Sequence, residues 1–384
     1  MKFQLDTPVA EKIDQACDFL EQIDTKGFYS KVTVERPWSS ENNVLSGEFS
    51  EPVPLRWFLQ REFSYLLEKG AILTLEDSRP KLQLRDSQLF QSINEDSWDF
   101  RQKKLFLFKP ERIDLSINRL AHYTGTEAQH FQKYILFTNY QMHTEVFLEM
   151  FPDCIQPKST NVQMPAYHHI AKNHCGVSLI NMGVGPANAK TITDHIAVLR
   201  PDLMIMLGHC GGLRNHQEIG DFVMASSYMR DDRVLDEILP PNIPIASNFF
   251  LNLILRGNLE KEGIAFRSGT VYTTINRNWE FNQEKALKDI FLSRAIAVDM
   301  ESATIAANGF RYRIPSATLL CISDKPLHAK IKLSKEAKQF YSHSKKNHLK
   351  IAIDTIQEVA QKFPYGLPND ELRAFNEPLM GGNL

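Results

Sequence analysis

Two acidic residues stand at the ends of apolar runs, where a fold can hold a carboxyl group in a dry pocket. Glu301 follows the run AIAVDM (295–300) and precedes small, mostly apolar residues. Asp324 ends the run ATLLCISD (317–324), and Pro326 follows two residues later. A carboxyl in such surroundings is costly unless it binds something, and a raised pKa suits it to general acid catalysis. These positions predict acid–base or charge-stabilising chemistry; the alternative is that each caps a helix or loop.

Glycines mark two further strand ends. One segment is MGVGPANAK (182–190), after an apolar run and before a helical pattern, and the other is GHCGGLR (208–214). Glycine lets backbone approach a ligand, and helix N-terminal amides favour anions. A dinucleotide fingerprint would need glycine in place of Asn188 and an acidic residue after the next strand. We therefore interpret these glycines as tight turns or as loops that line a ligand: Gly183, Gly185, Gly208, Gly211 and Gly212.

The histidines and cysteines give no metal or nucleophile pattern. His209 and Cys210 are neighbours, but no HxxH or CxxC spacing accompanies them, and no paired base can be identified for Cys210. The five cysteines are odd in number and scattered, which favours reduced thiols in a cytoplasmic protein. We expect no metal and no cofactor.

The elements that must position these residues follow an α/β pattern from about residue 119. Short apolar runs, typical of strands buried on both faces, recur between helical patterns at 188–199, 301–311 and 335–362. In open α/β sheets, ligands bind beyond the carboxyl ends of the strands. Residues 1–118 instead combine two helical patterns, 7–26 and 54–69, with short strands. We expect a smaller N-terminal α+β domain (1–118) and an α/β domain (119–384), whose strand runs are 134–139, 177–183, 203–212, 221–229, 295–300 and 317–324.

Charge and hydropathy exclude some function classes. The 384 residues include 44 basic and 46 acidic side chains, a net charge of −2, which gives no broad field for nucleic acid or anionic lipid. No run approaches the ~20 apolar residues of a membrane span, and the start, MKFQLDTPVAEKIDQ, lacks the apolar core of a signal peptide. We expect a cytoplasmic protein that binds neither nucleic acid nor membrane.

Six segments together resemble the AMP nucleosidase family of the purine nucleoside phosphorylase-like superfamily. The resemblance runs from about Arg119 to FNEP (375–378), and ERPWSSEN resembles the family's N-terminal domain. It implies a phosphorylase-like three-layer α/β sandwich around a twisted, partly closed mixed sheet. It also implies a hexamer, with a regulatory N-terminal domain through which ATP activates and phosphate inhibits. The segments are GVGPANAK, GHCGGLR, RDDRVLDEILPP, NRNWE, VDMESATIAANGF and LLCISDKPLHAKIKL.

The reaction implied by the resemblance is AMP plus water giving adenine and ribose 5-phosphate. Asp324, with Ser323 beside it, matches the group that supplies a proton near N7 of the departing base. Glu301 matches the family's ribose-binding glutamate, and Met300 packs against the sugar. A carboxylate near the cation-like sugar supplies electrostatic stabilisation.

The resemblance also suggests residues for the base and the phosphate. Asn278 and Trp279 of NRNWE are candidates for the wall against the base, although Trp279 could be a core residue. In the superfamily, a histidine before the first strand reaches the 5′ end of the nucleoside in the neighbouring subunit. This points to the segment HYTGT (122–126), which could instead be a polar linker. The phosphate candidates are His122, Tyr123, Thr124 and Thr126, with Arg230 and Arg233 as charged alternatives.

The water-activating base is less defined. Glu145 is the nearest match to the glutamate of related hydrolases, with His143 as a fallback. No arginine lies between Lys133 and Lys158 to bind an attacking phosphate, which favours water as the nucleophile. The alternatives are another nucleosidase or a purine nucleoside phosphorylase of the superfamily, or a non-catalytic adenine-nucleotide sensor. A sensor has no need of a leaving-group acid such as Asp324.

Overall fold

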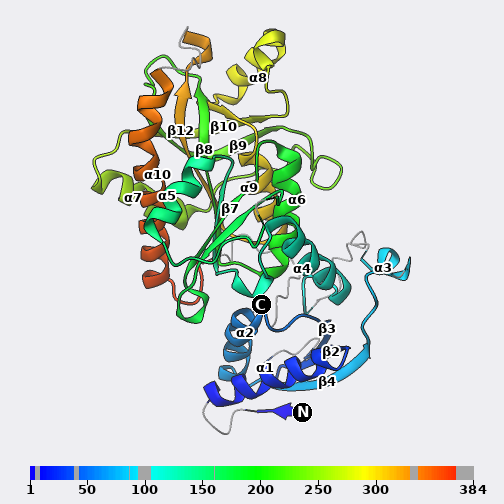
Figure 1. Ribbon diagram of the computed structural model, residues 1–384. Helices are drawn as coiled ribbons and strands as arrows, with labels where there is room; N and C mark the ends of the chain where they lie inside the picture. Colours follow the sequence, from blue (N-terminus) through cyan, green and yellow to red (C-terminus); the bar gives the residue numbers. More distant parts are fainter. Residues whose placement is uncertain are drawn as a thin grey trace.

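The computed structural model describes residues 1–4, 9–38, 43–85, 87–93, 105–159, 161–328 and 336–368. Within these ranges the chain forms two sheets, one of four strands and one of eight, and helix α4 (Pro110–Thr124) lies between them (Figure 1). The segment FNEP, which carries part of the resemblance, lies outside the described residues.

The N-terminal sheet is antiparallel throughout, with the order β1-β4-β2-β3. Its strands are β1 (Lys2–Phe3), β2 (Phe28–Glu35), β3 (Val44–Phe49) and β4 (Ile72–Pro80). Helices α1 (Val9–Thr25) and α2 (Arg56–Glu68) pack together beside it, and the short helix α3 (Ser87–Ser92) follows. The apolar side chains of α1 that recur at helical spacing are buried, as their pattern predicts: Ile13, Ala16, Cys17, Leu20 and Ile23.

The second sheet is mixed and has the order β11-β10-β9-β12-β8-β5-β7-β6. Strand β11 also pairs with β8, so β8, β12, β9, β10 and β11 close into a ring from which β5, β7 and β6 extend. The expected partly closed mixed sheet is therefore confirmed. The strands are β5 (Tyr134–Thr138), β6 (Ala166–His169), β7 (Val177–Asn181), β8 (Leu203–Gly212), β9 (Phe222–Asp231), β10 (Phe266–Thr274), β11 (Ala297–Asp299) and β12 (Ser316–Asp324).

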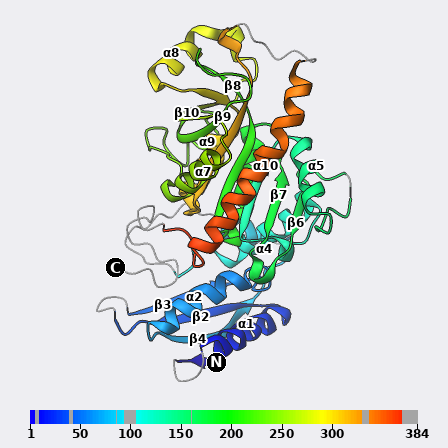
Figure 2. The ribbon, with the colours of Figure 1, turned by 90° about the vertical axis from the view of Figure 1, so that its left-hand side faces the viewer.

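Helices cover both faces of this sheet, which makes the expected three-layer sandwich (Figure 2). One layer holds α4, α6 (Pro186–Ile196) and α9 (Ser302–Tyr312), and the other holds α5 (Gln141–Met150), α7 (Phe249–Lys261) and α10 (Glu336–Lys362). Side chains of β5 alternate between two apolar clusters: Ile135 and Phe137 face the first layer, Tyr134 and Leu136 the second. Helix α8 (Gln283–Ser293) packs on a smaller third cluster.

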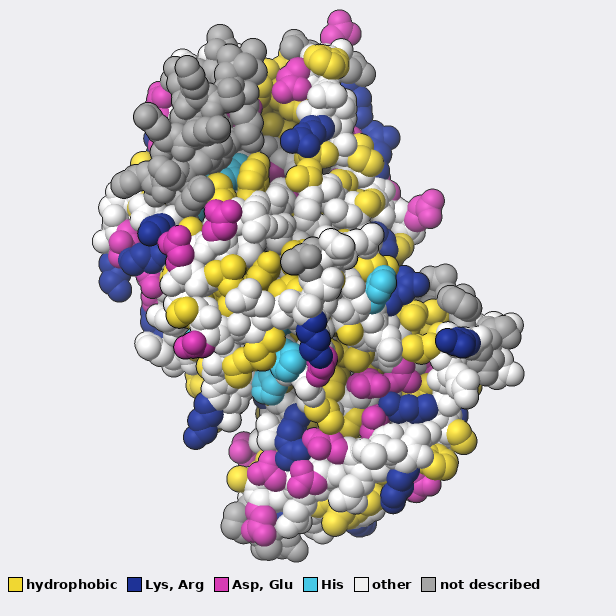
Figure 3. All heavy atoms as spheres, viewed as in Figure 1, with side chains coloured by type: hydrophobic (Ala, Val, Ile, Leu, Met, Phe, Trp, Pro, Cys, Tyr) yellow, Lys and Arg dark blue, Asp and Glu magenta, His cyan; other side chains and the backbone are white. Residues whose placement is uncertain are grey.

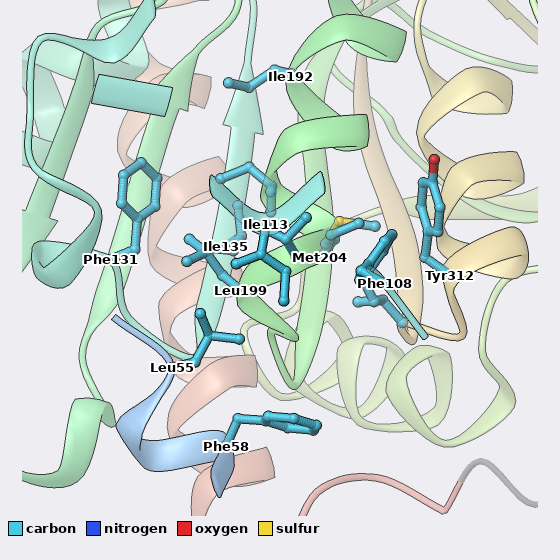
Figure 4. Close-up of a cluster of buried hydrophobic side chains, with 14 of the residues drawn as sticks. Leu55, Phe58, Phe108, Ile113, Phe131, Ile135, Ile192, Leu199, Met204 and Tyr312 are labelled. Atoms are coloured by element: carbon cyan, nitrogen blue, oxygen red, sulfur yellow. The ribbon is translucent and has the colours of Figure 1, made fainter. Parts of the chain in front are cut away.

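The apolar core continues from the α/β part into the N-terminal part (Figure 4). Leu55 and Phe58, beside and within α2, belong to the same cluster as Ile135 of β5 and Met204 of β8. Arg61 of α2 also forms an ion pair with Asp202, just before β8. The expected boundary near residue 118 falls inside α4, a helix that packs on both parts. The division into 1–118 and 119–384 stays a prediction.

The surface carries both signs of charge. On the face drawn in Figure 3, acidic and basic side chains are interspersed over the N-terminal helices. Between α1 and α2, Arg56 pairs with Asp14, Asp18 and Glu21 at 3.3, 2.8 and 2.6 Å. Among the described residues, no helix combines the length and apolarity needed to cross a membrane.

Candidate active site

Glu301 lies between β11 and α9, and its carboxylate is buried. Its Oε1 accepts a hydrogen bond from the backbone N–H of Gly185 (2.6 Å), and its Oε2 accepts one from Nδ2 of Asn139 (3.0 Å). Asn139 directly follows β5, and Gly185 precedes α6 with a φ of 114°, a conformation that favours glycine. Strand β11 runs antiparallel to β8, so the chain leads Glu301 back over the carboxyl ends of the parallel strands. There it meets Asn139 and Gly185, which are far away in the sequence.

A second buried carboxyl, Asp299, lies two residues before Glu301, and we call these two residues the carboxyl pair. Asp299 accepts hydrogen bonds from Thr273 Oγ1 (2.6 Å) and from the backbone N–H of Ser302 (2.9 Å), which begins α9. Burial, with the neighbouring Asp299 charge as a second cause, raises the pKa of Glu301 to about 8. Burial also raises the pKa of Asp299. Both causes disfavour the carboxylate form of Glu301.

Asp324 ends β12 and is half-buried at the rim of the same strand ends. Its Oδ1 accepts a hydrogen bond from Ser323 Oγ (2.5 Å), which also lies 3.3 Å from the carbonyl oxygen of Cys210. Lys325 is buried and donates to the carbonyl of Asn215 (2.8 Å). This backbone anchor fixes the residue that directly follows Asp324.

The glycines of GHCGGLR serve close strand packing. A Cβ at Gly212 would lie 3.0 Å from Ile322 Cγ2 of β12, and one at Gly211 would lie 3.0 Å from Val298 Cγ1 of β11. A Cβ at Gly208 would lie 2.9 Å from Met206 Cε and 3.6 Å from the Oδ1 of Asn139. Because these positions have no side chain, β12 and β11 can pack closely against β8 where the ring of strands closes. In the other glycine segment, MGVGPANAK, Gly185 approaches the carboxyl group of Glu301.

Buried histidines fix the loop that carries Asn139. Thr138 Oγ1 lies 2.7 Å from His143 Nδ1, His143 Nε2 lies 3.2 Å from His348 Nδ1, and His348 Nε2 lies 2.7 Å from the carbonyl of Leu319. We call Thr138, His143 and His348 the histidine relay. Burial lowers the pKa of His348 to about 4, so this ring is neutral at pH 7.

The bonds of the relay determine its proton positions. A carbonyl only accepts, so His348 Nε2 carries a proton and donates to Leu319, which leaves His348 Nδ1 as an acceptor. His143 Nε2 then donates to it, and the Nδ1 of a neutral His143 accepts from the hydroxyl of Thr138. That hydroxyl in turn accepts from the backbone N–H of Tyr140 (3.2 Å). Helix α10 is thus connected through hydrogen bonds to the residues on both sides of Asn139.

The proposed phosphate segment lies elsewhere in the same chain. HYTGT (122–126) precedes β5, at its amino end, whereas the carboxyl pair lies beyond its carboxyl end. The length of β5, about 16 Å, separates the two places. Thr124 and Thr126 are buried, and their hydroxyls lie 3.0 Å apart, while His122 is exposed and Tyr123 half-buried. A single chain therefore does not bring this segment to Glu301.

The two arginine candidates have protein partners. The guanidinium of Arg230 is buried, where it donates to the carbonyl of Leu239 (2.6 Å) and to Asp236 (3.1 Å). Arg233 is exposed, has a φ of 58° and pairs with Asp231 (3.3 Å). Arg230 thus stabilises its own loop, and Arg233 retains an exposed side chain.

The remaining candidates occupy different surroundings. Trp279 is buried in the small cluster under α8, whereas Asn278 is exposed. Met300 is half-buried between the two members of the carboxyl pair. Glu145 is exposed on α5, two positions from the inward-facing His143 and therefore on the opposite side of that helix. The roles assigned to these residues stay predictions.

Sequence reasoning missed three residues of the site: Asp299, Asn139 and His348. Asn139 is one polar residue after a strand, and this position was the only signal for it. His348 lies 205 residues from His143, on a helix whose pattern looked simply amphipathic. Among the described residues, no group of three or more His, Cys, Asp or Glu is arranged to hold a metal ion.

Comparison with known proteins identifies the class. Residues 148–357, more than half of the chain, match the model of the phosphorylase superfamily, so the chain belongs to this superfamily. The AMP nucleosidase of Escherichia coli K12 is 43% identical over 312 residues, which cover 71% of this chain and 64% of the relative. The chain thus spans somewhat less than two thirds of that relative's length.

Two further similarities agree with this placement. The crystal structure of AMP nucleosidase from Bacteroides thetaiotaomicron superposes with a TM-score of 0.55 at 31% identity, over 65% of this chain and 99% of that chain. A 5′-methylthioadenosine/S-adenosylhomocysteine nucleosidase of Maridesulfovibrio salexigens is 28% identical over 183 residues, 44% of this chain and 77% of the relative.

Proposed function

We propose that this protein hydrolyses the N-glycosidic bond of AMP to give adenine and ribose 5-phosphate. The observation that carries the proposal is the buried Glu301 carboxyl, held by Asn139 and Gly185 over the same strand ends where Asp324 stands. The similarity to two proteins named AMP nucleosidase supports AMP as the substrate.

The geometry suggests how the bond breaks. The bond between C1′ of ribose and N9 of adenine breaks, and its electron pair moves to the base, which Asp324 protonates near N7. The sugar becomes positively charged, and Glu301 as a carboxylate stabilises this charge in a buried setting, where electrostatic interactions are strong. Water then bonds to C1′ and gives up a proton through solvent, and Asp324 regains the proton that it lost to the base. In this proposal, Met300 packs against the sugar, and Asn278 and Trp279 lie on the side of the base.

The finer features implied by the resemblance belong to the same proposal. We propose a cytoplasmic hexamer, active in purine salvage, with residues 1–118 as a regulatory domain through which ATP activates and phosphate inhibits. The apolar core that joins α2 to the α/β part supports this coupling, because a ligand that shifts α2 would disturb residues packed on β5 and β8. Phosphate recognition is assigned to the HYTGT segment, with Arg233 as the exposed charged alternative.

A second candidate is a nucleosidase that acts on adenosine-type nucleosides without a 5′-phosphate. The similarity to a 5′-methylthioadenosine/S-adenosylhomocysteine nucleosidase favours it over a sensor. The test is to incubate the purified protein with AMP and, separately, with adenosine, with and without inorganic phosphate, and to measure free adenine. Adenine from AMP alone, without phosphate, is the expected result. Release from adenosine alone would favour the second candidate, and a requirement for phosphate would indicate a phosphorylase.

A further inference from the structure

The side-chain amide of Asn139 has one satisfied end and one unsatisfied end. Its Nδ2 donates to Glu301 Oε2 at 3.0 Å. Its Oδ1 is buried and has no hydrogen-bond partner in the part of the chain that the structure describes. Turning the amide by 180° exchanges the two atoms, and the unsatisfied end then becomes the NH₂ group. In either orientation, a buried polar atom beside Glu301 is without a protein partner.

An unsatisfied buried oxygen is costly, and such groups in folded proteins require an explanation. Movement of the loop could relieve the cost, but the histidine relay holds the residues on both sides, Thr138 and Tyr140. Gly208 opposite has no side chain, and a Cβ there would approach the Oδ1 to 3.6 Å. The loop is therefore held rigidly while one hydrogen-bonding position is left open.

The location of the open position identifies its partner. Strand β8 separates β12, which ends in Asp324, from β5, which precedes Asn139, so the two residues lie two strand spacings, about 10 Å, apart across the sheet. Asp324 is opposite Gly211 and Thr138 is opposite Leu207, so the two residues are also offset by about 10 Å along the strands. In the proposed function the base is at Asp324 and the sugar at Glu301. Asn139, in contact with Glu301, is then on the sugar side of the bond that breaks.

We propose that Asn139 is a substrate-binding residue whose amide oxygen accepts a hydrogen bond from a hydroxyl group in the site. Two sources have this chemistry: a ribose hydroxyl and the attacking water. This inference rests on the proposed function and extends it, because it names a group that binds the sugar or its nucleophile while it also holds Glu301 in place.

The test compares Asn139→Leu and Asn139→Ala with a matched control, Asn252→Ala. Asn252 on α7 also has a buried Oδ1 without a partner among the described residues, and its Nδ2 donates to the carbonyl of Ala225 (2.7 Å). It packs in the opposite layer, away from the carboxyl pair. Both Asn139 variants should lose at least roughly tenfold in kcat/KM for AMP, with thermal unfolding close to wild type, and Asn252→Ala should retain wild-type kinetics.

Deoxy substrates distinguish the two sources. If Asn139 binds a ribose hydroxyl, Asn139→Leu should lose little further activity on 2′-deoxy-AMP or on 3′-deoxy-AMP, because the substrate already lacks the donor. If it binds the attacking water, the loss should be in kcat and equal on all three substrates. The first pattern supports the proposal. The second supports it if Asn139→Leu still loses activity in a Glu301→Gln background, and a loss that vanishes in that background would overturn it, because Asn139 would then act only through Glu301.

Failure of the inference differs from failure of the proposed function. Wild-type protein that releases adenine from AMP, with both Asn139 variants equally active, would overturn the inference alone. Wild-type protein that releases adenine only from adenosine would overturn the AMP assignment. The same variants are then assayed on adenosine, where unchanged kinetics would again overturn the role of Asn139. If wild type hydrolyses neither, the role of Asn139 in this reaction is overturned together with the proposed function.

Discussion

The environments of Glu301 and Asp324 differ in ways that suit different roles. Glu301 is buried beside Asp299 and is disfavoured as an anion until a positive charge develops next to it. Asp324 stands half-buried at a strand end with the Ser323 hydroxyl on one oxygen, which leaves its second oxygen for the proposed contact with the base. As a carboxylate, Glu301 gains most when the positive charge of the sugar develops beside it, so it would bind the transition state better than the substrate, which is the condition for catalysis.

The raised pKa of Glu301 predicts how activity depends on pH. Since the carboxylate is the useful form and burial raises its pKa, kcat/KM for AMP should rise with pH up to about 8. Asp299→Asn removes the neighbouring charge and should move this rise to lower pH. Between pH 4.5 and about 8 the folded protein binds more protons at Glu301 than the unfolded chain does, so this group's contribution to stability falls across the same window. A pH profile of kcat/KM that is flat from pH 5 to 8 would contradict the assignment.

Replacement of the acid should separate turnover from binding. Asp324→Asn should lower kcat for AMP by about 10²–10⁴-fold, because the proton is needed only as the bond breaks, while the Kd for AMP measured by calorimetry should change little. Glu301→Gln should also lose turnover. Near-intact turnover of Asp324→Asn would assign the acid to another residue.

At the scale of elements, the site results from topology. Strands β5, β8 and β12 are parallel neighbours, so their carboxyl ends share one edge, and the antiparallel β11 delivers Glu301 back across it. The apolar runs in the sequence predicted these strands well, since both faces of each are buried. Strand β10 was not predicted: FRSGTVYTT is largely polar, and its first half is only partly buried. Sequence spacing also gave no sign that β11 pairs with both β10 and β8, because pairing between distant strands depends on closure of the whole sheet.

Helix α10 should influence turnover although neither member of the carboxyl pair lies on it. His348→Leu removes the acceptor of His143 and leaves a buried N–H unsatisfied, which should cost about 1–3 kcal/mol of stability and release the loop that holds Asn139. The expected result is a lower kcat for AMP at 25 °C, where the variant is still folded. Ile356→Ala, a buried position on the same helix, is the control: it should destabilise by about 2–5 kcal/mol and leave kcat unchanged. Equal kinetics in the two variants would remove the relay from any positioning role.

At the scale of the whole molecule, the two parts of the chain share one apolar core, so the boundary expected near residue 118 has no simple counterpart in packing. The change in sequence pattern near residue 119 corresponds to a change in structure, because parallel strands begin at β5. However, α4 belongs to both parts: Glu111 pairs with Arg79 of the N-terminal sheet (2.5 Å), and Arg112 donates to the carbonyl of Asp194 in α6 (3.1 Å). Because α4 packs on both parts, its sequence alone does not show where one part ends and the other begins.

The separation of HYTGT from the carboxyl pair leads to a prediction about assembly. If His122 binds the phosphate of AMP, it must do so in the site of a second copy, since both places lie at opposite ends of β5 in one chain. His122→Ala and Glu301→Gln should each be inactive on AMP alone. Co-expressed, they should form mixed oligomers in which an intact Glu301 faces an intact His122 from the other chain, and part of the activity should return. Recovery would also require the protein to elute as an oligomer in gel filtration. Mixed oligomers without recovery would exclude a shared site. A monomeric protein that cleaves AMP would instead require a phosphate-binding residue closer to Glu301 in the same chain. The exposed Arg233 would then be the next residue to replace.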